Sequence, residues 1–173
     1  MLDAAYRVWI ECSEKKRRCL WLHGVASTGK TAWWNLFKSI FVGSYLKINS
    51  DKFQETDNIP RTQIVGLNDI NADRITSAEL ASEMKNLLEG EGMSVNTKMG
   101  TKKLMFVGCH FMITSNNLPV KKAVKHTVYD DKQIDEWEPF EERCEFVSLS
   151  VRYDKRCEAK FDKYDVCRYW MNK

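Results

Sequence analysis

The sequence predicts an α/β fold in three layers, in which helices cover both faces of a central and largely parallel sheet. Short apolar runs of strand-like composition alternate with segments whose apolar residues recur every three or four positions, and this alternation is typical of a layered fold with a parallel sheet. The first apolar run leads through a glycine-bounded loop directly into a helical segment. The length of 173 residues suits one domain and is sufficient for a buried core.

The expected elements have local signals. Helices are expected where apolar residues share one face, over residues 1–17, 32–41, 77–88 and 162–171. Strands are expected in short apolar runs between turn signals, over residues 19–22, 44–48, 62–67, 93–98, 102–107, 111–115 and 146–151. The two runs that flank residues 99–101 predict a β-hairpin with a basic tip, and residues 119–142 are expected to form a loop.

Cap residues set some of the expected boundaries. Gly43 is expected to end the helix 32–41, because many helices end at a glycine. Asn49, Ser50 and Asp51 belong to the residue types that cap helix N-termini, so we interpret them as an N-cap cluster.

Composition excludes several classes of protein. The 27 basic and 24 acidic residues give a net charge of +3, which by itself does not indicate nucleic-acid binding. No apolar run approaches the roughly 18 residues of a membrane-spanning helix, and the acidic and aromatic N-terminus does not look like a signal peptide. None of the six cysteines forms a Cys-x-x-Cys pair, so no zinc site is expected. Cys19 and Cys109 lie in apolar runs, which favours reduced thiols and an intracellular location.

Residues 24–31 read Gly-Val-Ala-Ser-Thr-Gly-Lys-Thr and match the phosphate-loop pattern G-x-x-x-x-G-K-[ST] in full, between an expected strand and an expected helix. Such a loop turns its N–H groups onto phosphate oxygens, and the helix start adds its positive dipole end. Lys30 would neutralise charge on the β and γ phosphates, and the Thr31 hydroxyl would bind Mg²⁺. The residues expected to bind ATP are Gly24, Val25, Ala26, Ser27, Thr28, Gly29, Lys30, Thr31 and Ala32.

A phosphate-loop ATPase also needs an acid near the metal and a base for the attacking water. Asp69 is the only carboxylate at the end of the strand 62–67, and Asn68 precedes it. Asp69 would polarise the water while Asn68 orients a metal-bound water, or Asp69 would serve the metal alone. The simpler interpretation is an aspartate that caps a turn.

Asn116 follows the apolar strand 111–115. An asparagine in this place can contact the γ phosphate or the attacking water. Asn116 and Asn117 before Leu-Pro are equally a plain turn signal. Asn116 therefore indicates a function only through its place after the phosphate loop, the acidic strand end and the basic hairpin.

That order resembles the superfamily 3 viral helicases, and most closely the helicase domain of parvovirus-type replication initiator proteins. The segments that carry the resemblance are WLHGVASTGKT, IVGLNDI, LLEGEGMSVNTKMGTKK, FMITSNN and PFEERCEFVSL. The resemblance covers roughly residues 5–150. It departs from the family at Asn68, which replaces the first of two paired acids, and at Glu141, where many relatives have a basic residue.

The resemblance implies an AAA+-like P-loop NTPase fold with a β-hairpin insertion. It divides the chain into an N-terminal helix (1–18), an ATPase core (19–151) and a C-terminal extension (152–173). It further implies a Mg²⁺-dependent ATPase that forms a ring, expected to be hexameric, around single-stranded DNA and unwinds duplex DNA during viral replication in the host nucleus.

The resemblance also assigns roles to single residues. Lys98, Lys102 and Lys103, which we call the hairpin lysines, would contact single-stranded DNA; the simpler interpretation is a solvated hairpin tip. Arg143 would reach the γ phosphate of a neighbouring subunit, or would form an ion pair with Glu141 or Glu142. The expected catalytic residues are Lys30, Asp69, Asn116 and Arg143, and the expected metal ligands are Thr31, Asp69 and Asn68.

Two other functions fit the sequence. Asn68 would mark a weakened catalytic centre in an ATP-gated module for oligomerisation and DNA binding. Alternatively, the chain would be another phosphate-loop DNA motor, such as a packaging ATPase.

Overall fold

The computed structural model describes residues 1–11, 19–49, 52–55, 62–70, 78–91, 93–97, 100–104, 109–118, 142–151 and 162–173. The expectations for Ser50, Asp51, Lys98, Glu141 and the loop 119–141 lie outside these residues.

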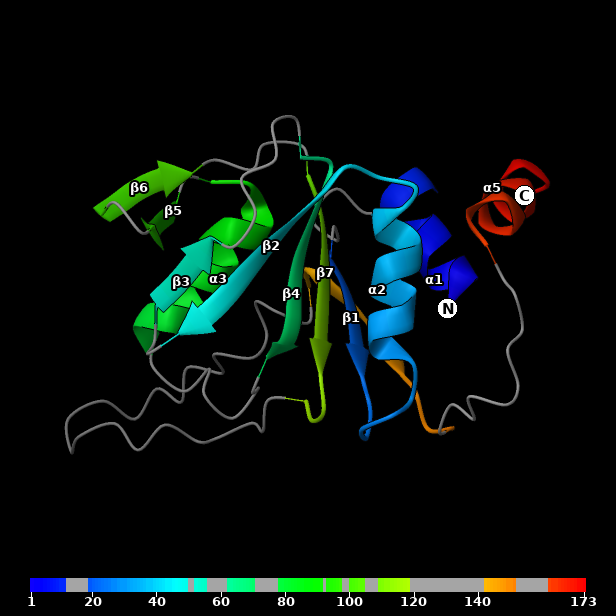
Figure 1. Cartoon of the computed structure of the whole chain (residues 1–173), viewed down its shortest axis with the longest axis horizontal. Coiled ribbons are helices and arrows are strands. Elements are labelled where there is room, and N and C mark those ends of the chain that lie inside the picture. Colours follow the sequence, from blue (N-terminus) through cyan, green and yellow to red (C-terminus); the bar gives the residue numbers. More distant parts are fainter. Residues whose placement is uncertain are drawn as a thin grey trace.

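The described strands form one eight-stranded sheet with the order β6-β5-β3-β2-β4-β7-β1-β8. The strands are β1 (Cys19–His23), β2 (Gly43–Asn49), β3 (Lys52–Glu55), β4 (Ile64–Ile70), β5 (Met93–Thr97), β6 (Gly100–Leu104), β7 (His110–Ser115) and β8 (Cys144–Ser148). The consecutive strands β2, β4, β7, β1 and β8 of this order pair in parallel. The β2–β3 and β5–β6 pairs are antiparallel, and the second of these is the predicted hairpin, which continues the sheet at the end far from α1 and α5 (Figure 1).

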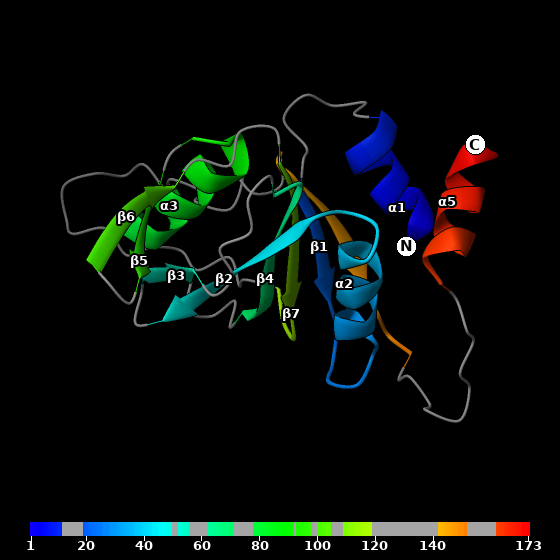
Figure 2. The same ribbon diagram turned by 45° about the horizontal axis from the view of Figure 1, so that its top comes forward.

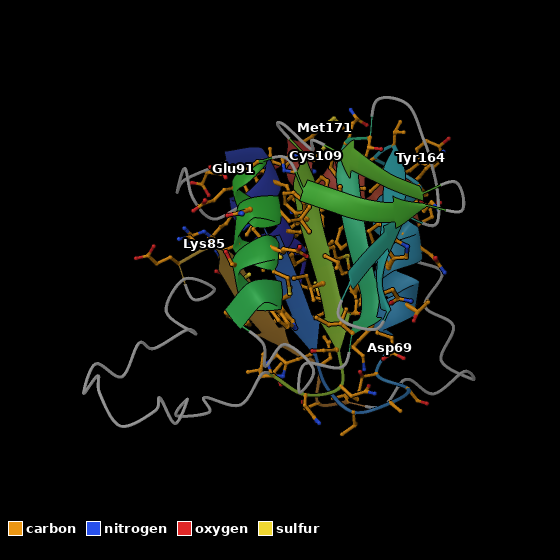
Figure 3. All side chains as sticks on the ribbon, turned by 90° about the vertical axis from the view of Figure 1, so that its left-hand side faces the viewer. Asp69, Lys85, Glu91, Cys109, Tyr164 and Met171 are labelled. Carbon is orange, nitrogen blue, oxygen red and sulfur yellow. The ribbon has the colours of Figure 1, made fainter. Side chains whose placement is uncertain are left out.

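Helices cover both faces of this sheet, as predicted. They are α1 (Leu2–Tyr6), which continues as the π-helical turn η1 (Arg7–Glu11), α2 (Lys30–Lys38), α3 (Ala78–Glu89) and α5 (Lys163–Met171). Figure 3 shows α3 and α2 on opposite sides of the strands. The three-layer α/β fold with a largely parallel central sheet is therefore confirmed.

The core is divided by the sheet because successive side chains of a strand point to opposite faces. Cys19 and Trp21 of β1 pack with Met84, Leu87 and Leu88 of α3. The alternate residues, Leu20 and Leu22, pack instead with α1, α2 and α5. The sheet thus separates an α3 core from an α2 core.

The two terminal helices lie side by side (Figure 2). Tyr169 donates a hydrogen bond to Asp3 over 2.8 Å, and the Trp170 indole donates to the Leu2 carbonyl over 3.3 Å. Asp162, expected as the first residue of this helix, is its N-cap, because its side chain accepts from the N–H groups of Tyr164 and Asp165. The sequence anticipated both helices but not their contact.

Two expected boundaries are wrong. Gly43 does not end α2, which stops at Lys38; the Ser39 hydroxyl bonds the Leu36 carbonyl, and Gly43 is the first residue of β2. Asn49, the described residue of the proposed N-cap cluster, is instead the last residue of β2, where it pairs with Lys52 in the antiparallel β2–β3 ladder. Asparagine is compatible with a helix cap and with the end of a strand, and the sequence alone did not separate the two cases.

Among the described cysteines, Cys19, Cys109 and Cys144 are buried with free thiols. No helix within the described ranges is both long and apolar enough to cross a membrane.

Candidate active site

The candidate site lies at the edge of the sheet where β1, β4 and β7 end. These three strands are parallel and adjacent, with β7 between the other two. The loop that joins β1 to α2 runs past this edge (Figure 1), and Asp69 lies at the same edge (Figure 3). Ligands of open α/β sheets bind at this kind of position, outside the carboxyl ends of the strands.

The loop has the backbone that its glycines predict. Gly24, Ser27 and Gly29 have φ values of 154°, 67° and 82°, of which those of the glycines cost little. A Cβ on Gly24 would stand 2.2 Å from the Leu149 carbonyl oxygen, directly after β8, so no side chain fits there. The Gly24 N–H also bonds the Ser115 carbonyl over 3.3 Å, which ties the loop to β7. A strand, this loop and a helix that begins at Lys30 make the P-loop arrangement.

Lys30 is the first residue of α2 and is only 8% exposed. Its ammonium group donates to the carbonyls of Gly24 over 2.6 Å and Val25 over 2.9 Å. It also donates to the side-chain oxygen of Asn116 over 3.1 Å. The lysine therefore lies inside the curve of its own loop and is linked to the residue that follows β7.

The charges at the site influence one another. Burial lowers the pKa of Lys30, and the Asp69 carboxylate opposes this shift. Burial, followed by the positive charge of Lys30, lowers the pKa of His23 at the end of β1. An ammonium group, an imidazole and a carboxylate from three different elements are thus close enough to interact.

Asp69 stands in an unusual backbone conformation at the end of β4. Its φ is 54°, and its side chain is exposed. The ladder with β7 shifts between Leu67, which pairs with Ile113, and Ile70, which pairs with Ser115. Between these pairs the chain advances by three residues on β4 and by two on β7. Strand β4 therefore contains one extra residue, which is a β-bulge.

Thr114 of β7 contacts both residues of this bulge. Its hydroxyl accepts a hydrogen bond from the Asp69 N–H and donates one to the Asn68 side-chain oxygen, each over 2.7 Å. Thr114 is 2% exposed. The sequence interpretation missed it, although a threonine inside an otherwise apolar strand was the signal available.

The structure brings Lys30, Asn116 and Asp69 together, and their catalytic roles stay predictions. Thr31 follows Lys30 as an exposed residue of α2. The Asn68 side-chain oxygen accepts from Thr114, so a direct bond from that oxygen to a metal would compete with an existing hydrogen bond.

Arg143 lies away from the candidate site, directly before β8, at the end of the sheet where β1 and β8 begin. Cys19 pairs with Cys144, and the Cys19 N–H bonds the Arg143 carbonyl over 3.2 Å, so Arg143 lies beside the start of β1. The five residues of β1 separate it from the loop, a distance of about 17 Å at ~3.3 Å per residue. The guanidinium is 7% exposed and forms an ion pair with Glu89 at the end of α3. Glu142, one of the two partners that the sequence suggested, lies 3.8 Å away.

The hairpin lysines stand only partly within the described structure. Lys102 and Lys103 belong to β6, where they pair with Val95 and Ser94 of β5, and Lys98 falls outside the described residues. A Cβ on Gly100, with φ of 124°, would meet nothing within 4 Å, so the start of β6 is open. Contact of these lysines with DNA stays a prediction.

A family model described as a family of unknown function (DUF5906) matches residues 22–132. The chain belongs to this family. The match starts within β1 and includes the P-loop, Asp69 and Asn116, whereas β8 and α5 lie outside it. The candidate site, apart from the contact of Leu149 with Gly24, is therefore built from the DUF5906 segment.

Two solved structures are similar to this DUF5906 chain. The A-form apo structure of the NrS-1 C-terminal region has 19% identity and a TM-score of 0.47, and the match covers 99% of this chain and 38% of that one. The X-ray structure of JCV helicase has 14% identity and a TM-score of 0.43, with 91% and 42% covered. The chain thus spans about two fifths of the length of each. No curated protein sequence matches it. The fold assignment rests on the strand order and loop geometry described above.

Proposed function

We propose that this chain is an ATP-hydrolysing motor domain that moves along single-stranded DNA and unwinds duplex DNA, as a superfamily 3 helicase of a viral replication protein would. The observation that carries the proposal is the meeting of Lys30 with Asn116, while Asp69 stands at the end of the adjacent strand. A phosphate loop alone would indicate nucleotide binding. The additional amide and carboxylate at the same edge supply groups that could act on the γ phosphate and the attacking water.

In this proposal, the phosphates take over the contacts that hold Lys30. The ammonium group now bonds two loop carbonyls and Asn116. Bound phosphate oxygens would offer it stronger, charge-assisted hydrogen bonds. Asn116 is already placed at the lysine, so it would lie near the γ phosphate and orient the attacking water. Asp69 would accept the proton of that water.

The donor set suits Mg²⁺, which prefers oxygen ligands and a small number of carboxylates. The Asp69 carboxylate is exposed at the strand end, and the Thr31 hydroxyl is exposed in the first turn of α2. These two side chains would hold the ion, which neutralises charge that develops on the phosphates. Asn68 is proposed as a structural residue rather than a direct ligand, because Thr114 already bonds its side-chain oxygen.

The wider setting follows from the family resemblance. The chain would assemble into a ring, with the hairpin lysines facing single-stranded DNA, and would act during viral DNA replication in the host nucleus. A finger role for Arg143 would require its guanidinium to exchange Glu89 for the phosphate of a neighbouring subunit.

The direct test is ATP turnover with and without single-stranded DNA, followed by strand separation on a forked duplex. Lys30→Ala should abolish turnover, because the phosphates lose their fixed cation. Lys85→Ala is the control, since that lysine lies on α3, away from the P-loop edge (Figure 3). Turnover by Lys30→Ala within a few-fold of the parent would show that the loop is not the catalytic centre.

The finger proposal has a separate test. Neither Lys30→Ala nor Arg143→Ala subunits should hydrolyse ATP alone. Mixed assemblies contain interfaces that pair an intact loop with an intact arginine, and these should regain part of the activity. Mixed assemblies that form but stay inactive would assign Arg143 to the ion pair with Glu89 alone.

A second function, an ATP-gated module for oligomerisation and DNA binding, is favoured by one observation. Asn68 stands where a second acid is common among the proteins that the sequence resembles, and its side chain is used within the protein. This alternative predicts nucleotide-dependent assembly and DNA binding without turnover. Turnover without strand separation would instead indicate a DNA motor of another kind, such as a packaging ATPase.

A further inference from the structure

The bulge at the end of β4 changes which residue faces the core. Val65, Leu67 and Ile70 all belong to the α3 core. Strict alternation would place residues 65, 67 and 69 on that face. The extra residue at the bulge brings Ile70 there instead and leaves Asp69 exposed. Without the bulge, the Asp69 carboxylate would point toward an apolar core.

This arrangement needs support, because the bulge breaks the ladder and leaves Asp69 in a left-handed conformation. Residues other than glycine adopt this conformation uncommonly, and aspartate is one of the types that do so where local hydrogen bonds support it. The bulge also removes regular ladder partners from the backbone groups of residues 68 and 69. The Asp69 N–H is part-buried, so a partner within the protein is worth more to it than it would be at a fully exposed position.

Thr114 supplies that bond. Its hydroxyl accepts a hydrogen bond from the Asp69 N–H and donates one to the Asn68 side-chain oxygen, both over 2.7 Å. It is 2% exposed, so water does not readily replace it. Thr114 thus binds both residues of the bulge at once, from the neighbouring strand that also leads to Asn116.

The same contacts explain a role for Asn68. Its side-chain oxygen accepts the Thr114 hydroxyl proton. An aspartate could accept the same bond, but it would place a second negative charge next to Asp69. Asparagine keeps the acceptor without that charge, so the departure from paired acids is compatible with an intact Asp69 site.

We infer that Thr114 is a positioning residue of the ATPase site, whose hydroxyl fixes the bulge at the end of β4 and thereby sets where the Asp69 carboxylate stands. Thr114 touches neither nucleotide nor metal in this inference, and acts through Asp69. The inference rests on the proposed function, but the state of the bulge can be measured without nucleotide.

The test compares Thr114→Val, which keeps the shape and removes the hydroxyl, with Thr114→Ser, which keeps the hydroxyl. Burial of Ile70 still favours the bulge, so Thr114→Val should loosen it rather than abolish it. We expect kcat for ATP to fall about 10- to 100-fold, as for other residues that orient a catalytic group. KM should stay within about threefold, because the P-loop keeps its contacts. Thr114→Ser should recover most of kcat.

Two further measurements make each outcome decisive. Hydrogen exchange of the Asp69 N–H, followed by NMR without nucleotide, should be about tenfold faster in Thr114→Val and near the parental rate in Thr114→Ser. Thermal melting checks that the variants are folded at the assay temperature. Unchanged exchange in Thr114→Val would overturn the inference. So would a kcat that falls equally in both variants, or a loss confined to KM. A parent without ATP turnover would refute the proposed function, and Asp69 exchange alone would then decide whether Thr114 holds the bulge.

Discussion

Gly66 of β4 is predicted to be essential to the packing of α2, because the ring of Trp34 lies directly on its Cα. A Cβ at position 66 would stand 2.4, 2.6 and 2.7 Å from three carbons of the Trp34 six-membered ring. Carbon atoms prefer separations of ~3.5–4.0 Å, so ring and strand would have to part by about 1 Å. Trp34 is 1% exposed, so its ring is buried within the α2 core.

The expected magnitude follows from two opposing effects in Gly66→Ala. Overpacking a rigid core typically costs ~1–3 kcal/mol, and the rigid indole places this site in the upper part of that range. Replacing glycine with alanine also restricts the unfolded chain, which stabilises by ~0.4–1 kcal/mol. The net loss is about 1–2.5 kcal/mol. At ~2–4 °C per kcal/mol for a chain of this size, Tm should fall by roughly 2–10 °C.

The assay is thermal and urea unfolding of the parent, Gly66→Ala and a matched control, Gly43→Ala. Gly43 lies on the neighbouring strand β2, where a Cβ would stand 3.0 Å from the flexible Lys38 side chain and 3.2 Å from a methyl group of Ile64. These contacts are short by a few tenths of an ångström rather than about 1 Å, so Tm should change by less than about 3 °C. Trp34→Phe has a smaller ring and should relieve Gly66→Ala, with a coupling of about 1 kcal/mol or more in the double mutant. Equal melting of the two alanine variants, or additive effects in the double mutant, would refute this packing argument.

The remaining predictions concern charge and catalysis. Asp69→Asn should lower ATP turnover at least about a hundredfold while nucleotide binding persists, as measured by steady-state kinetics and titration; near-normal turnover would place the essential carboxylate elsewhere. Neutralising the hairpin lysines should reduce the slope of log DNA affinity against log salt by about 0.7 for each lost phosphate contact, and an unchanged slope would make them solvated residues. Glu89→Gln should lower the free energy of unfolding by ~1–3 kcal/mol in urea, because the buried guanidinium of Arg143 loses its closest carboxylate; equal stability would refute this. The folded-state pKa of His23 is lowered, so the unfolded chain binds more protons and stability should fall as pH drops below the unfolded value of about 6.5. His23→Gln should flatten this dependence below about pH 6.5, and an unchanged slope would assign it to other groups.

Much of the fold could be predicted because its signals are local. The run Cys19–His23 and the strand His110–Ser115 are short, apolar and buried, and they form parallel neighbours in the sheet. The glycines of the P-loop have the positive φ values that their spacing implies. Helix α3 buries Met84, Leu87 and Leu88 as its periodicity predicted.

The parts that could not be predicted depend on contacts between distant residues. Glu89 meets Arg143 only because the end of α3 packs beside the start of β8, and no local pattern marks either residue for the other. At the bulge, the Asp69 N–H bonds a hydroxyl 45 residues later in the chain. Asn49 lies at the end of a strand rather than at a helix N-terminus, because it pairs with Lys52 in the β2–β3 ladder, and asparagine is compatible with both places.

The strand order also has a consequence for how the protein is made. Strand β1 carries the P-loop, yet its neighbours β7 and β8 begin their pairing with Cys19 at Phe111 and Cys144, which leave the ribosome about 90 and 125 residues later. At ~5–20 residues per second, β1 waits roughly 5 to 25 s for its partners. During this interval, an apolar, strand-forming segment has both edges unpaired, and such edges can pair with other chains. The nucleotide site is consequently among the last parts to form during synthesis, and a nascent chain that stalls before β7 cannot form the β1–β7 pairing on which the site is built.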